Sequence, residues 1–232
     1  MLSARALNVE CLTRSYEGLR HILNLPMLDH FALLNEPRRP WLDPEKLKAK
    51  FLALSAEVHP DRFHQAAETE HHAANQRFVA LNAAYQVLRE PKDRLLHLLE
   101  LELGAKPTDV QPTSSGAMEL FLEVGQLCRE VDAFLAERAK LTSPLLLVGL
   151  FERGQEWTDK LNAVQNRIQS EQDRLLAEAK EMNARWEFID GLAEAERRQQ
   201  LPLDRLEQMY RRFSFLARWS EQIRERLVRL SC

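Results

Sequence analysis

The 232-residue sequence contains few residues that interrupt helices, with only 7 glycines. No run combines the alternating hydrophobicity and the flanking turn residues of a β-strand. Leu, Ala, Glu, Arg and Gln, which favour helices, are common instead. These features disfavour β-rich classes and predict an all-α fold. With 45% hydrophobic residues, the chain can bury the core of one or two domains.

Long apolar runs are also missing. The longest, residues 145–150, falls far short of the roughly 20 residues that a helix needs to cross a bilayer. Charges of both signs are interspersed, and the formal net charge is −3. We therefore expect neither a membrane nor a nucleic acid as a partner.

Cysteine is scarce, and Cys11, Cys128 and Cys232 lie far apart in the chain. No Cys-x-x-Cys pair occurs, so we expect no zinc site and no other metal site. Isolated reduced thiols are typical of cytosolic proteins. The expected location is therefore the cytoplasm, or the mitochondrial matrix if the source is eukaryotic.

Residues 1–27 form an N-terminal extension with two possible interpretations. Its arginines are typical of a mitochondrial transit peptide. Glu10 and Glu17 disfavour that interpretation, because transit peptides contain few acids. They favour a short helical extension that packs its apolar side chains on the next domain.

Two amphipathic helices, expected over residues 44–58 and from 66 or 69 to 89, flank a polar connector. Their apolar residues recur with the 3.6-residue period of a helix. These residues are Leu47, Phe51, Leu54 and Val58 in the first helix and Ala74, Phe78, Leu81, Tyr85 and Leu88 in the second. The pattern predicts an antiparallel helix pair whose tip carries His59-Pro60-Asp61. Pro60 fixes φ and lacks an N–H group, so it ends the first helix and stiffens the tip.

Short helices are expected on either side of this pair. Asp29 is suited to cap a helix over residues 29–34, and Asp43-Pro44 is suited to begin the first long helix. A last short helix over residues 92–103 can end at Gly104.

Residues 105–116 contain two prolines and several Ser and Thr residues, which indicates a linker between domains. Three long helical stripes follow within residues 117–232, and they predict an antiparallel three-helix bundle. Loops are expected near Ser143-Pro144 and between Gly191 and Pro202. Two glycines could also interrupt the start of the middle helix, namely Gly149 and Gly154.

The order of helix, His59-Pro60-Asp61, helix and the segment at residues 81–88, followed by Pro91 and Arg94, resembles a J-domain over residues 28–104. J-domains stimulate ATP hydrolysis by chaperones of the DnaK class. Arg62-Phe63 and the leucine-rich helix after Arg94 resemble, more specifically, the HscB family. Its members are J-proteins of iron–sulfur cluster assembly and have a three-helix C-terminal domain.

The resemblance implies that His59, Pro60 and Asp61 bind a DnaK- or HscA-type ATPase and trigger hydrolysis in that partner. The chain would then be an activator, with no catalytic residue and no cofactor of its own. A small hydrolase that uses this His-rich loop is the alternative. The loop offers no nucleophile or pocket, however, and the spacing of His59, His64 and His71 matches no standard metal site.

Basic residues of the first long helix are expected to add an electrostatic contact with the ATPase. Lys46 and Lys50 are four residues apart and share one solvent face, and Arg62 follows the tip. Nearer the loop, HscB-like sequences usually carry another basic residue where this chain has Ser55-Ala56-Glu57.

The first helix of the bundle is expected to carry a second contact surface. Leu120, Val124, Leu127, Val131 and Phe134 share one sector, and Met118, Leu122, Gly125 and Arg129 lie opposite it. The resemblance places the IscU-type scaffold on this surface, at Met118, Phe121, Leu122, Gln126 and Arg129. A leucine of the family is Gly125 here, and acidic positions are Gln126 and Arg129.

Two other interpretations of this surface remain open. The linker or the J-domain could cover Met118 and Leu122, or the bundle could serve another client or oligomerisation.

Overall fold

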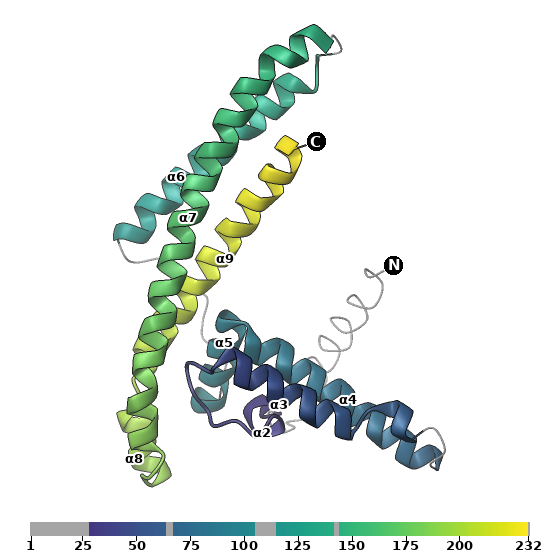
Figure 1. Cartoon of the computed structure of the whole chain (residues 1–232). Coiled ribbons are helices and arrows are strands. Elements are labelled where there is room, and N and C mark those ends of the chain that lie inside the picture. The colour runs from purple at the N-terminus through teal and green to yellow at the C-terminus, as the bar shows by residue number, and fades with distance from the viewer. Residues whose placement is uncertain (1–27, 64–66, 105–114, 142–143, 232) are drawn as a thin grey trace. The chain divides into compact units, whose positions relative to one another are not determined.

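The computed structural model describes residues 28–63, 67–104, 115–141 and 144–231 (Figure 1). Every regular element in these ranges is a helix, which confirms the predicted all-α fold. The chain divides into two compact units, Met1–Lys106 and Pro107–Cys232. The predicted extension at residues 1–27 lies outside the described residues, as do Cys11, His64, Cys232 and most of the predicted linker.

The first unit is built on a hairpin of α3 (Pro44–Glu57) and α4 (Glu68–Arg89), which lie side by side (Figure 1). The Asp43 carboxylate begins α3 by accepting hydrogen bonds from the backbone N–H groups of Glu45 and Lys46, at 3.0 and 3.1 Å. Between the two helices the rings of Phe51 and Tyr85 stack, with centroids 4.3 Å apart. The predicted helix pair is therefore present.

Two shorter helices close the base of this hairpin. Asp29 caps α2 (His30–Leu33), and α5 (Pro91–Leu103) ends at Gly104, whose φ of +74° is the left-handed conformation that glycine tolerates best. Both predicted helix ends are confirmed. Fully buried side chains at this base come from α2, the residue after it, α4 and α5. They are Phe31, Leu34, Leu88, Leu95, Leu98 and Leu99.

A buried arginine links these parts. Arg94, at the start of α5, donates from Nε to the Pro40 carbonyl at 2.9 Å and from Nη1 to the Leu88 carbonyl at 2.7 Å. Burial lowers its pKa to about 10, although the nearby Glu90 carboxylate acts in the opposite direction. Arg94 thus joins the loop before α3 to the end of α4.

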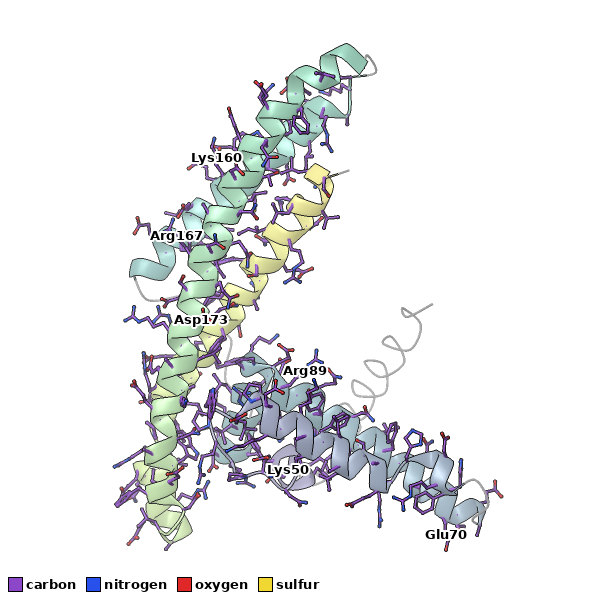
Figure 2. The ribbon with its side chains drawn as sticks, in the orientation of Figure 1. Lys50, Glu70, Arg89, Lys160, Arg167 and Asp173 are labelled. Atoms are coloured by element: carbon purple, nitrogen blue, oxygen red, sulfur yellow. The ribbon has the colours of Figure 1, made fainter. Side chains whose placement is uncertain are left out.

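The second unit is a bundle of α6 (Ser115–Arg138), α7 (Pro144–Ile189) and α9 (Leu203–Ser231), each in contact with the other two. Its buried core includes Val124, Val131, Phe134, Leu161, Ile168, Leu175, Trp186, Leu206, Met209, Phe213, Leu216 and Ile223. Ion pairs cross between the helices, for example from Arg167 of α7, labelled in Figure 2, to Glu123 of α6 at 2.6 Å. This arrangement confirms the predicted three-helix bundle.

Two details of the bundle differ from expectation. Helix α7 runs without interruption through Gly149 and Gly154, because one glycine costs a helix only about 1 kcal/mol relative to alanine. Gly154 also faces Phe134, whose ring lies 3.8 Å from where a Cβ would be. The expected loop between Gly191 and Pro202 contains a short helix, α8 (Glu194–Gln200), whose residues are mostly good helix formers.

Among the described residues, no helix has both the length and the apolar character needed to cross a bilayer.

Candidate functional site

The tip of the α3–α4 hairpin is exposed, as expected. After α3 ends at Glu57 the chain turns through η1 (Pro60–Phe63). The side chains of His59 and Asp61 are 46% and 90% exposed. The backbone N–H of Asp61 donates to His59 Nδ1 at 3.3 Å, so Nε2 carries the proton of the neutral imidazole. The tip thus offers a hydrogen-bond donor and a carboxylate to any partner.

Contacts from both helices hold this exposed tip in place. The Phe78 ring of α4 meets the His59 ring edge-on, with centroids 5.3 Å apart and planes at 77°. Arg62 donates from its backbone N–H to the His59 carbonyl at 3.0 Å and from Nη1 to the Ala56 carbonyl of α3 at 3.2 Å. The orientation of His59 is therefore set by packing as well as by the fixed φ of Pro60.

Metal chemistry at the tip finds no support in the described part of the chain. No group of three or more His, Cys, Asp or Glu side chains lies close enough there to hold a metal ion. His59 Nδ1 and Asp61 Oδ2 are 3.5 Å apart, a separation that is attractive only when the imidazole is protonated.

The predicted basic residues divide into two kinds. Lys46 is exposed and makes no side-chain ion pair with a described residue. Lys50, labelled in Figure 2, lies 2.7 Å from the Glu36 carboxylate and donates to the Asn35 carbonyl at 2.9 Å. Lys50 therefore ties α3 to the loop that precedes it, and Arg62 holds the end of α3.

Sequence reasoning missed two residues that shape this site. The sequence places Phe78 only in the apolar stripe of α4. The signal that could identify its contact with His59 is its position in the half of that helix nearer the tip. Glu36 lies in a loop without periodicity, so no sequence signal pairs it with Lys50.

The second predicted surface lies on α6. We call the side chains of Met118, Phe121, Leu122 and Arg129 the α6 surface. The three apolar members are 43%, 47% and 61% exposed, so the other described residues of the second unit do not cover them. Phe121 approaches the Trp219 ring of α9, with centroids 6.2 Å apart.

The remaining predicted residue of this helix, Gln126, is exposed and donates to Glu130 Oε1 of the same helix at 2.9 Å. It lies beside the α6 surface. All five predicted residues therefore occupy exposed positions of α6.

Comparison with known proteins agrees with this architecture. The model of the DnaJ domain matches residues 29–97. A co-chaperone protein HscB homolog of Bordetella pertussis is 36% identical over 122 residues, which make up 49% of this chain and 69% of the relative.

Two solved structures share the fold. Chaperone HscB from Vibrio cholerae is similar with a TM-score of 0.56 and 22% identity, over 85% of this chain and 96% of that one. Human co-chaperone protein HscB is similar with a TM-score of 0.54 and 20% identity, over 87% of this chain and 83% of that one. Together with the identity and coverage of the curated relative, these findings show that the chain belongs to the HscB family of J-domain co-chaperones.

Proposed function

We propose that this protein stimulates ATP hydrolysis by a DnaK- or HscA-type chaperone. The observation that carries the proposal is the exposed but packed tip, with His59 held against Phe78 and Asp61 open to solvent. A tip that is already ordered loses little conformational entropy when it docks. Docking that is tighter to the hydrolysis-ready state of the ATPase shifts the partner toward that state.

Lys46 is the basic residue best suited to support this docking. It is exposed on α3 and no described carboxylate neutralises it. A cation in this position speeds encounter with an acidic groove more than it strengthens the final complex. Pro60, by its fixed φ, and Arg62, by its bond to α3, contribute by stiffening the tip. Lys50 contributes to the extent that its ion pair with Glu36 opens.

We propose further that the bundle delivers an iron–sulfur cluster scaffold of the IscU type. The α6 surface supports this assignment, because exposed Met, Phe and Leu side chains that lie together on one helix are typical of a protein-binding site. Holding the client on the same chain as the tip raises its effective concentration at the ATPase.

A single-turnover ATPase assay with purified DnaK and HscA, each with and without the scaffold, tests the proposal. We expect the wild-type chain to accelerate hydrolysis and His59→Gln to abolish the acceleration. Because His59 is half exposed, its replacement changes the free energy of unfolding by no more than about 1 kcal/mol.

His72→Gln is the matched control, since it makes the same change at an exposed position of α4. Full stimulation by the His59 variant, or turnover of ATP by the chain without any chaperone, would contradict the proposal.

A different client, or a role of the bundle in oligomerisation, is the second candidate. It is favoured by Gly125, Gln126 and Arg129, which replace the leucine and acids expected from the family resemblance. A pull-down with the purified scaffold separates the two. Enrichment that is lost in Leu122→Ala supports scaffold binding, and no enrichment with the intact chain supports another client.

A further inference from the structure

Arg129 is an exposed cation that lies among the apolar residues of the α6 surface. Its guanidinium Nη1 is 3.6 Å from the place where a Cβ of Gly125 would be, so the side chain folds back along its own helix. Gly125 follows Leu122 by three residues and Phe121 by four, and these positions share one helix face. The absence of a side chain at Gly125 therefore leaves the charge of Arg129 close to the apolar patch.

No carboxylate of the described residues lies within ion-pairing distance of Arg129. This is unusual in the bundle, where most arginines of α9 pair with an acid. The paired arginines are Arg205, Arg211, Arg212, Arg224, Arg226 and Arg229. Among the described residues, none therefore uses the ion-pairing capacity of Arg129.

A second arginine without an ion pair to any described residue, Arg218, belongs to the neighbouring face of α9. The residues of this face recur every three or four positions and are called the α9 row: Phe215, Arg218, Gln222 and Arg226. Both ends of the row are tied to α6. Phe215 stacks on Trp219, which meets Phe121, and Arg226 pairs with Asp132 at 2.6 Å. Arg218 therefore lies along the open edge of the same surface.

Acids and arginines are mixed at the end of the α9 row. Asp132 is shared between Arg226 and Arg229, so one carboxylate faces two guanidinium groups. Glu225 of α9 also lies near Cys128 of α6. Burial raises the pKa of the Cys128 thiol. Four charged groups lie near enough to have smaller effects on the same pKa: Arg226, Asp132, Arg129 and Glu225. Among the groups around Cys128, Arg226 is held by Asp132, whereas Arg129 has no ion pair with a described residue.

We propose that the α6 surface and the α9 row bind a client whose contact face is apolar and rimmed by carboxylates, with Arg129 as the central ion pair. This inference rests on the proposed function, in which the α6 surface holds the client. An arginine beside exposed apolar side chains is typical of interface anchors, because its planar fork binds a carboxylate through two hydrogen bonds. An acidic partner gains these bonds without breaking an existing ion pair between Arg129 and a described residue.

Binding of the full chain to a purified IscU-type scaffold, measured by calorimetry at about 50 and about 300 mM salt, tests the inference. We expect the wild-type affinity to fall as salt increases. Arg129→Glu should weaken binding at low salt by about tenfold or more, and adding Arg218→Glu should weaken it further. Both arginines are exposed and have no ion pair with a described residue, so thermal melting should barely change.

Arg174→Glu is the matched control. It makes the same change of charge on α7, where the side chain is 79% exposed, and it should leave the affinity within about twofold of wild type. Leu122→Ala reports on the apolar part of the surface.

Each outcome decides a different statement. If Leu122→Ala weakens binding and Arg129→Glu does not, the client assignment stands and the acidic partner face is wrong. If the wild-type chain does not bind the scaffold at all, the client assignment is wrong and this inference falls with it. Equal weakening by Arg174→Glu would also overturn the inference, because the effect would then follow net charge and not position.

Discussion

The contact between Phe78 and His59 gives a quantitative prediction about the tip. Phe78→Leu removes the aromatic ring that meets the imidazole edge-on at a centroid distance of 5.3 Å, and it keeps an apolar side chain in the α4 stripe. Such ring contacts contribute about 1 kcal/mol beyond the burial of surface. Losing this amount reduces the population of the ordered tip about fivefold relative to its alternatives.

The expected consequence is a change in apparent affinity and not in maximal rate. Only the ordered tip is assumed to dock, so the concentration of this protein that gives half-maximal ATPase stimulation should rise up to about fivefold. Once the complex is formed, the tip is ordered again and the saturated rate should equal that of wild type. A titration of DnaK or HscA in single-turnover ATPase assays separates these two quantities.

Two control measurements accompany this titration. Phe151→Leu makes the same substitution at a highly exposed position of α7 and should change neither quantity. Thermal melting of Phe78→Leu confirms that the first unit is folded at the assay temperature, because removing part of a half-buried ring also costs stability. An unchanged half-maximal concentration, or a fall in the saturated rate alone, would refute the reasoning.

Three further predictions concern the base of the first unit. Arg94→Met should lower the free energy of unfolding, measured in urea titrations, by about 3–5 kcal/mol, because the Pro40 and Leu88 carbonyls lose a buried, charged donor. A loss below about 1 kcal/mol would contradict this expectation. Burial lowers the pKa of His30, so the unfolded chain binds the proton first and stability should fall as the pH drops below about 6.5. Thermal melting at about pH 7.5 and 5.5 checks this expectation. His30→Gln should reduce the dependence of stability on pH. Glu36→Gln should release Lys50 and lower the half-maximal concentration for ATPase stimulation about twofold, since a partly exposed ion pair of about 0.5 kcal/mol no longer competes. An unchanged value would assign Lys50 to the loop alone.

Helix ends of the first unit were predictable because their signals are local. The Asp29 and Asp43 carboxylates accept backbone hydrogen bonds within three residues, and Gly104 needs only its own freedom at positive φ. The same local reasoning gave too much weight to Gly149 and Gly154. Their small cost is outweighed by the packing of a 46-residue helix on its neighbours.

Long-range pairs of the site were beyond sequence reasoning. Lys50 and Glu36 are joined by a loop without periodicity, so the sequence does not pair them. On α6, the sequence shows that Gly125 and Arg129 depart from the family pattern, but it does not show that the Arg129 guanidinium lies over Gly125. Nothing in the sequence told which arginines of α9 pair with acids of the described chain and which, like Arg218, do not.

The sequence by itself determined the all-α class, the hairpin that carries His59-Pro60-Asp61, and the bundle, because apolar periodicity and capping act within a few residues. Only the tertiary structure decided which side chains meet across elements: His59 meets Phe78, Lys50 meets Glu36, and Arg129 meets no acid of the described residues. The physical reason is that a charge or a ring is attractive to any complementary group nearby, and the packing of the helices alone selects which group is near.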